Sequence, residues 1–271
     1  MSMQVTHHVF IPDQQMKPGV KLNHMRWAGQ YIADTFAGTK NKVRLINAGD
    51  GYDFPSLSSY DKGKGAMEGR RYNKDLAAGR EGLALFEEGL HDHEHKLWEP
   101  ESKDVTLGNH EYRILRAVEQ DVHTLEGRMG YHELAYEEFG WTMHDFLKVI
   151  KHDGIMYSHY FANRGTGKPI GGENIKLRIR KIGGSFGQGH EQTFDTGMVY
   201  TSDGRRMQGL VSGAFYLHEE DYLGPQGNAH WRGIQVLHDV RRGEYDLMSV
   251  SMDYLCRRYE GKRLSQFLGR H

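Results

Sequence analysis

The chain has 271 residues, of which 38% are hydrophobic, 26% charged and 11% aromatic, and its formal net charge is −1. This composition is typical of a folded globular protein, and the balanced charge gives no support to non-specific coating of nucleic acid. The single cysteine, Cys256, excludes an intrachain disulfide and a multi-cysteine metal site. No apolar run approaches the roughly 18 residues of a membrane helix, and no signal peptide is visible. We therefore expect a cytoplasmic protein without a membrane partner.

The first part of the chain alternates between strand and helix patterns. Short apolar runs predict buried strands, and apolar residues at helical spacing predict helices between them. The predicted strands are Val5–Ile11, Val43–Ile46 and Asp104–Leu107, and the predicted helices are Asn23–Phe36 and Asn73–Leu90. A polar, glycine-rich loop at Phe54–Arg71 separates the second strand from the second helix. This order indicates a β-α-β-α-β unit.

The second part of the chain is richer in strand patterns. We expect one or two helices in Glu111–Phe146, a strand at Gly154–Tyr160, a helix at Lys176–Lys181 and a flexible loop at Gly183–Gly189. Alternating apolar residues then predict antiparallel strands, the last of which would hold a buried Cys256. These strands cover residues 198–204, 209–217, 231–240 and 245–255. With no repeat or clear linker, we expect a single domain over 1–271, with cap insertions around 54–72 and 111–146.

Several common motifs are absent or incomplete. Gly167-Lys168 is followed by Pro169, so there is no Walker A loop, and Ser212 lacks the G-x-S-x-G elbow. The histidine-rich segment His91–His95 has residue types that bind metals. Because it follows a predicted helix and precedes a proline, a solvated loop is the favoured interpretation.

Five other segments carry oxygen or imidazole side chains, and the first four lie at or just after the ends of predicted strands. They are Pro12-Asp13-Gln14-Gln15, Gly49-Asp50-Gly51-Tyr52-Asp53, Gly108-Asn109-His110-Glu111, Ser158-His159 and Gly189-His190-Glu191-Gln192. Ligand sites in α/β sheets form at the carboxyl ends of strands. Mixed carboxylate and imidazole sets suit Mn, Fe or Zn, and hydrolases that use two metal ions employ such sets. The five segments therefore predict a metal site.

The ordered set resembles the calcineurin-like metallophosphoesterase superfamily, whose pattern is D-x-H, G-D-x-x-D, G-N-H-[ED], a lone H and G-H-x-H. The second, third and fourth elements match fully. Phosphoesterases encoded by bacteriophages are similar also in the stretches Pro55–Lys64 and Glu68–Tyr72. The resemblance implies an α/β fold, a four-layer α/β/β/α sandwich of two mixed sheets with the later strands in the second sheet, and a location in the host cytoplasm for a phage protein.

The resemblance also implies roles for individual residues. Asp50 would bridge two metal ions, Asn109, His159 and His190 would complete one site, and Asp13 would belong to the other. His110 would act beside the phosphate, as an acid toward the leaving oxygen or as a stabiliser of charge. Asp53 would orient His110 through a hydrogen bond.

The chain departs from the family pattern at two positions. Gln15 and Gln192 stand where the family has histidines, and both lost histidines belong to the same metal site. We therefore expect this site to be either weakened or built from oxygen ligands (Asp13, Gln15, Asp50, Gln192). A neutral glutamine oxygen favours Mn or Mg over Zn. The expected cofactors are two divalent ions, with Mn first and Mg, Fe or Zn as alternatives.

The resemblance implies hydrolysis of a phosphate ester by a metal-bridging hydroxide. The expected enzyme is a phosphodiesterase that acts on nucleic acid or a nucleotide. Basic residues in the loop after Asp53 are candidates for binding substrate phosphate: Lys62, Lys64, Arg70 and Arg71. Two alternatives stay open, namely a small-molecule phosphatase or nucleotide pyrophosphohydrolase, and a non-catalytic metal-binding module on the same scaffold.

Overall fold

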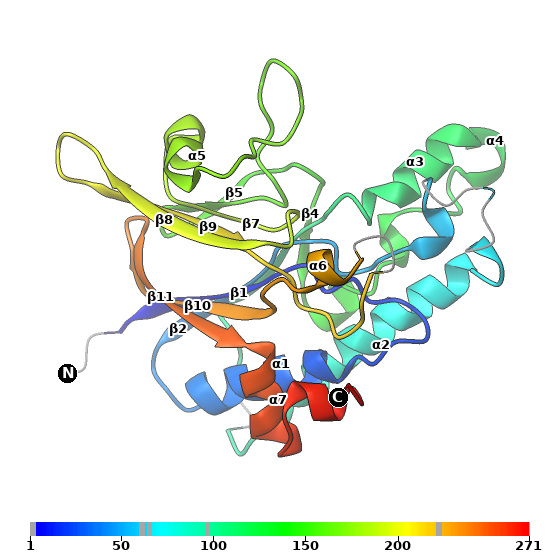
Figure 1. Cartoon of the computed structure of the whole chain (residues 1–271), viewed down its shortest axis with the longest axis horizontal. Helices are drawn as coiled ribbons and strands as arrows, with labels where there is room; N and C mark the ends of the chain where they lie inside the picture. Colours follow the sequence, from blue (N-terminus) through cyan, green and yellow to red (C-terminus); the bar gives the residue numbers. More distant parts are fainter. Residues whose placement is uncertain (1–3, 60–62, 64–66, 96–97, 221–223, 271) are drawn as a thin grey trace.

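A computed structural model describes residues 4–59, 63, 67–95, 98–220 and 224–270. Its strands form two mixed sheets (Figure 1). The first sheet contains, in spatial order, β11 (Glu244–Ser251), β10 (Gly233–Arg241), β1 (Thr6–Ile11), β2 (Lys42–Asn47), β3 (Ser102–Thr106) and β4 (Thr142–His144). The strands β1 to β4 are parallel, whereas β10 pairs antiparallel with both β1 and β11.

The second sheet contains, in spatial order, β5 (Ile150–His152), β6 (Ile155–Tyr157), β7 (Phe186–Gln188), β9 (Arg206–Ser212) and β8 (Phe194–Tyr200). The strands β6, β7 and β9 are parallel, and the two edge strands are antiparallel to their neighbours. Apolar side chains from both sheets form a shared core, which includes Phe10, Ile46, Tyr157, Leu210 and Leu237. Burial of these side chains holds the sheets face to face.

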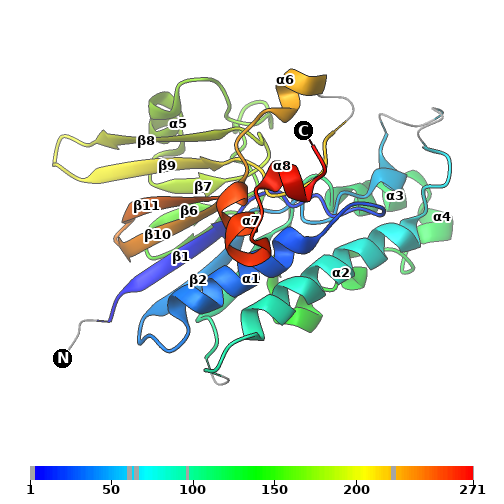
Figure 2. The same ribbon diagram turned by 60° about the horizontal axis from the view of Figure 1, so that its bottom comes forward.

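Helices cover the outer faces of both sheets (Figures 1 and 2). Helices α1 (Asn23–Phe36), α2 (Tyr72–His91) and α7 (Met252–Glu260) lie on the first sheet, and α5 (Ile175–Ile182) lies on the second. Apolar residues on one side of α1, among them Met25, Ile32 and Phe36, are buried in the core beneath the helices. The expected α/β architecture with two mixed sheets is therefore present.

Short helices and turns complete the chain. They are α3 (Tyr112–Gln120), α4 (Val122–Leu125), α6 (Gly224–Asn228), α8 (Leu264–Phe267) and 3-10 turns at Pro55–Leu57, Tyr131–Glu133 and Glu137–Phe139. Within the described ranges, no helix has both the length and the apolar character that a membrane crossing requires.

Three predictions of local structure were wrong, and a fourth was confirmed. The loop expected at Gly183–Gly189 contains β7, because Phe186 packs into the core beneath α5. The one or two helices expected in Glu111–Phe146 are present as α3 and α4, and β4 lies near the end of this stretch. The strand expected at 209–217 ends at Ser212. The last strand ends at Ser251, so Cys256 lies in α7, although it is buried as expected.

The placement of the late strands also differs from the expectation. The resemblance assigned them to the second sheet, but β10 and β11 extend the first sheet beside β1. Only β8 and β9 join the second sheet. The first sheet therefore depends on pairing between residues more than 200 positions apart, such as Val9 and Val236.

Candidate metal centre

The five predicted segments follow five strands at their carboxyl ends. Asp13, Asp50 and Asn109 follow β1, β2 and β3 in the first sheet, and His159 and His190 follow β6 and β7 in the second. Parallel strands within one sheet end at the same edge. The two sheets therefore bring loops from distant parts of the chain to one end of the sandwich.

The centre of this cluster is formed by Asp50, His159 and His190. Each offers a ligand atom, and these atoms all lie within 4.8 Å of one another. The Asn109 Oδ1 atom lies 2.9 Å from His159 Nε2 and 2.8 Å from His190 Nδ1. Asp50 Oδ2 lies 3.4 Å from His159 Nε2. A carboxylate, an amide oxygen and two imidazole nitrogens thus converge on one point, as the ligands of a divalent cation do.

A backbone carbonyl fixes the orientation of one imidazole. His159 Nδ1 donates a hydrogen bond to the Ala48 carbonyl oxygen over 2.8 Å. Because a carbonyl can only accept, Nδ1 carries the hydrogen and Nε2 is the atom left to bind a cation. The side chain is fully buried, so this orientation is held by packing as well.

Glycines let the loops approach the carboxylates closely. A Cβ atom on Gly108 would lie 2.1 Å from Asp50 Oδ1, and one on Gly189 would lie 2.3 Å from Asp13 Oδ1. The glycine before Asn109 and the glycine before His190 are therefore required by the packing of the site.

Strained backbone also gathers at this centre. The non-glycine residues Gln15, Asp50, His190 and Gln192 have positive φ angles of 44°, 48°, 69° and 57°. Such conformations cost free energy and persist where surrounding structure enforces them, most often at functional sites.

Asp13 and Gln15 lie beside the cluster, deep in the protein. Both Asp13 carboxylate oxygens accept from the His190 backbone N–H over 3.1 Å, and both Gln15 side-chain polar atoms are buried without a hydrogen-bond partner within the described chain. Burial raises the pKa of Asp13, and the nearby charge of Asp50 adds to the rise. A second cation between these groups would relieve the repulsion and satisfy the amide.

Gln192 has a partner within the protein. Its Oε1 atom accepts a hydrogen bond from the Tyr216 hydroxyl over 2.8 Å. Its side-chain carbonyl oxygen is therefore engaged by a phenol, and a role as a cation ligand stays a prediction.

The neighbouring His110 contacts both expected partners. Its Nδ1 atom lies 2.9 Å from Asp53 Oδ1, and its Nε2 atom lies 3.7 Å from Asp50 Oδ2. Burial acts to lower the pKa of His110, but the Asp50 and Asp53 carboxylates outweigh it and raise this pKa. The contact with Asp53 is the one expected from the resemblance, and the orienting role of Asp53 stays a prediction.

Three residues of this site have no role in the sequence prediction. Glu111 accepts hydrogen bonds from the backbone N–H groups of Gly108, Asp50 and Tyr52 over 2.8 to 3.0 Å, which ties the loop after β2 to the loop after β3. Arg113 Nη2 lies 3.0 Å from His110 Nε2, and Lys17 Nζ lies 3.4 Å from Asp53 Oδ2. For Arg113 the sequence offered one signal, its spacing, because Arg113 follows His110 by three residues at the start of α3.

The four basic residues expected to bind substrate give a mixed outcome. Lys62 and Lys64 lie outside the described residues. Arg70 donates to the Pro55 carbonyl oxygen, and Arg71 donates to the Arg70 carbonyl oxygen. These contacts hold the loop together and leave the substrate role a prediction.

The His91–His95 segment has a different character. Its side chains are mostly exposed, and His91 Nε2 lies 3.0 Å from Glu99 Oε1. Within the described part of the chain, Asp50, His159 and His190 form the one group of histidine, cysteine and acidic residues with metal-binding geometry. The solvated-loop interpretation agrees with this exposure.

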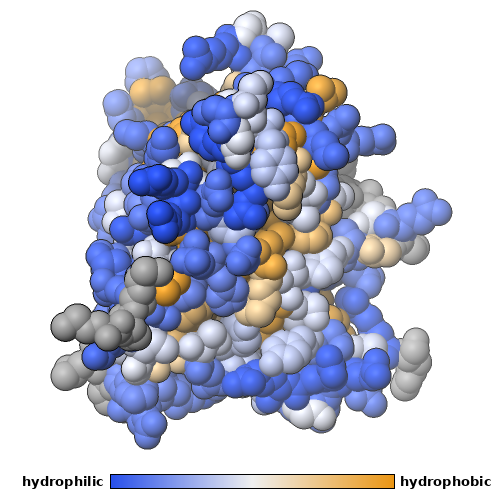
Figure 3. Space-filling view, turned by 90° about the vertical axis from the view of Figure 1, so that its left-hand side faces the viewer, coloured by the Kyte–Doolittle hydropathy of each residue, from blue (hydrophilic) through white to orange (hydrophobic). Residues whose placement is uncertain are grey.

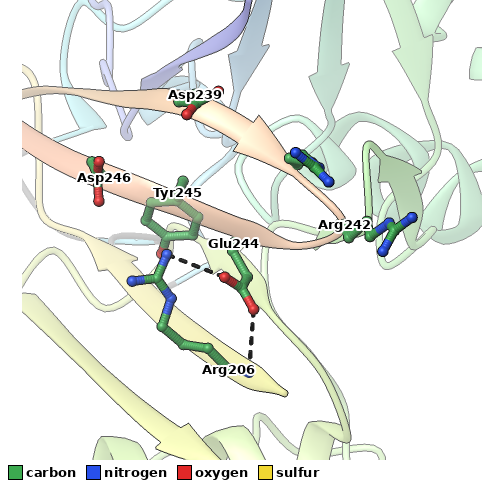
Figure 4. A pocket seen from close by; sticks show the side chains of 7 residues that line it. Arg206, Asp239, Arg242, Glu244, Tyr245 and Asp246 are labelled. Carbon is green, nitrogen blue, oxygen red and sulfur yellow. Dashed lines mark hydrogen bonds and ion pairs between the residues drawn. The ribbon is translucent and has the colours of Figure 1, made fainter. Parts of the chain in front are cut away.

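Two cavities lie at the opposite end of the sandwich, near the start of β9 and the β10–β11 turn. One of about 310 Å³ is lined by Arg206, Arg242, Glu244 and Tyr245 among others (Figure 4), and the next is about 320 Å³. Arg206 pairs with Glu244 over 3.5 Å, so these charges compensate each other. The surrounding face is mostly hydrophilic with a limited apolar band (Figure 3). Neither cavity includes a residue of the cluster.

Comparison with known proteins finds no family model that matches the chain and no curated protein that matches it significantly. The function therefore has to be argued from the geometry of the site.

Proposed function

We propose that this protein is a metal-dependent phosphoesterase with a metallophosphoesterase fold. The observation that carries the proposal is the convergence of Asp50, Asn109, His159 and His190 from four loops. The order of these loops in the chain resembles the calcineurin-like superfamily, and their strand-end placement in two facing sheets supports the same assignment.

The donor set fits two divalent cations. Asp50, Asn109, His159 and His190 would hold one, and Asp13 and Gln15 together with Asp50 would hold the other. Oxygen ligands in the second set favour Mn²⁺ or Mg²⁺ over Zn²⁺. Cations held here would lower the pKa of water and neutralise charge on a phosphate.

The residues beside the cations supply the remaining chemistry. Asp50 and Asp53 raise the pKa of His110, and its Nε2 atom lies on the side of Asp50. Because the Arg113 guanidinium can only donate, Nε2 accepts a hydrogen bond from it in this structure, and a proton that replaced this hydrogen bond would be the one passed to a departing ester oxygen. Arg113 adds a fixed positive charge next to His110, which suits an anionic substrate.

The proposed substrate is a phosphodiester of a nucleic acid or a nucleotide. The resemblance to bacteriophage phosphoesterases supports this choice. A small-molecule phosphatase is the second enzymatic candidate. A non-catalytic metal-binding module is favoured by one observation, the hydrogen bond that engages Gln192 with Tyr216.

An assay of the full chain separates these candidates. We expect Mn²⁺-dependent hydrolysis of bis-p-nitrophenyl phosphate and single-stranded DNA, abolished by chelation. Activity that survives complete removal of metal contradicts the proposal. Hydrolysis of p-nitrophenyl phosphate alone would identify a phosphatase, and bound metal without any turnover would identify a binding module.

A further inference from the structure

Three aromatic side chains border the candidate metal centre. Tyr112 begins α3, Phe146 follows β4 and Tyr160 directly follows His159. The Tyr112 and Phe146 rings are stacked with centroids 5.0 Å apart, and Phe146 meets Tyr160 edge-on at 5.6 Å. We call these three residues the aromatic rim.

The aromatic rim contacts the cation-binding histidines. The Tyr160 ring lies 4.8 Å from the His190 ring, and the Phe146 ring lies 6.2 Å from the His159 ring. A group bound to cations at His159 and His190 would therefore lie next to these rings.

The rim is not needed to fill the hydrophobic core. Within the described residues, none of its three rings belongs to a core cluster or to the apolar residues packed against one. All three are only half-buried, although core aromatics such as Phe186 and Tyr157 are fully buried. His159 is oriented by the Ala48 carbonyl and Asn109, so the rim has no necessary role in aiming it.

We propose that the aromatic rim stacks the base of a nucleotide whose phosphate is bound at the metal centre. The inference rests on the proposed function, because it takes the phosphate to lie at the cations. Half-exposed aromatic rings bind planar bases of any sequence through their faces. Nucleotides carry a planar base within reach of their phosphate, and they are the substrate class proposed above for this site.

The test measures binding rather than turnover. The Mn²⁺-loaded protein is titrated by calorimetry with two ligands that resist hydrolysis. One is the phosphonate isostere of thymidine 5′-monophosphate, and the other is the same sugar phosphonate without a base. We expect the wild-type protein to bind the first at least about fivefold more tightly, as one stacked base provides.

Variants separate stacking from support of the metal site. Tyr160→Leu and Phe146→Leu are expected to remove the preference for the base and to leave the affinity for the sugar phosphonate and for Mn²⁺ unchanged. Tyr160→Phe retains a ring and should keep the preference even if the leucine variants fold poorly. Tyr200→Leu is the matched control, because Tyr200 is 66% exposed on β8.

Equal affinity of the wild-type protein for both ligands would overturn the proposal, as would an equal loss for both ligands in the leucine variants. Hydrolysis of bis-p-nitrophenyl phosphate is measured on the same samples. A base preference without any hydrolysis would contradict the phosphoesterase function but support base stacking on the aromatic rim. Hydrolysis without a base preference would support the phosphoesterase function and contradict the stacking proposal.

Discussion

The metal centre and the ion pairs around Asp104 use the same residue types in different ways. Asp104 on β3 places one carboxylate oxygen 2.8 Å from His144 Nε2 and the other 3.1 Å from His152 Nε2. These imidazoles are 21% and 22% exposed, whereas His159 is fully buried. Each oxygen of Asp104 therefore faces a different imidazole, one through a hydrogen bond from His144 and the other at ion-pair distance from His152.

At the metal centre the geometry is convergent instead. The Asn109 oxygen faces two imidazole nitrogens at once, and Asp50 Oδ2 approaches one of the same nitrogens. Atoms that converge in this way in a buried place suit a cation, which can take all of them as ligands at once. Convergence and burial, rather than residue type, distinguish the candidate metal centre from the ion pairs around Asp104.

The largest effect is expected from Asp50→Asn. Loss of the charge that both cations share should lower bound Mn²⁺ and reduce kcat/KM by about a thousandfold or more. Metal analysis and the bis-p-nitrophenyl phosphate assay measure the two effects. Asp104→Asn is the matched control and should retain its metal. If the two variants lose metal equally, the distinction drawn between the clusters is wrong.

His110→Ala should affect the rate but not the metal. Removal of a proton donor typically lowers kcat by about 10²- to 10⁴-fold. Because His110 contacts Asp50 and Asp53 without joining the ligand set, bound Mn²⁺ should stay at the wild-type level. Metal content and kcat measured on the same sample check this separation. A parallel fall in both quantities would mean that His110 is a ligand.

The affinity for Mn²⁺ should increase with pH. Burial opposes the charge on His159, but Asp50 raises the pKa of this imidazole to about 9, so the cation must displace a proton at neutral pH. Burial lowers the pKa of His190 to about 4, and this imidazole has no proton to displace. Calorimetry between pH 6 and pH 8 should show roughly tenfold tighter binding per pH unit. An affinity that does not change over this range would contradict the protonation assigned to His159.

The smallest effect is a loss of stability in Asp104→Asn. Burial acts to raise the pKa of Asp104, but hydrogen bonds from His144 and His152 outweigh it and lower this pKa. The carboxylate therefore stabilises the fold above pH 4, and this contribution is lost as the pH falls through the folded-state pKa. We expect the free energy of unfolding to decrease by about 1 to 3 kcal/mol at pH 7. Denaturant unfolding should show a smaller difference in free energy between the wild-type protein and the variant at pH 3 than at pH 7. The same difference at both pH values would argue against an ionised Asp104.

Local pattern was sufficient for several elements. The spacing of Met25, Ile32 and Phe36 predicted α1 with the bounds Asn23–Phe36 that the structure has. Strands β1 and β2 were predicted within one residue at each end. These elements are long or strongly patterned, so their own residues carry the signal. The three residues of β7 carry too little local signal, and this strand forms because its neighbours β6 and β9 pair with it.

Most of the loops that meet at the candidate metal centre were predictable from the sequence alone, because polar side chains placed after buried strands form a visible pattern. Tertiary structure alone decided that Glu111 joins two of these loops, that Tyr216 engages Gln192, and that Asp104 completes an ion-pair network. Those outcomes depend on contacts between residues distant in the chain. The physical reason is that a shift of about half an ångström decides whether a side chain can act as a ligand or only lies beside one. Packing of the two sheets sets these distances, and local sequence propensity does not encode them.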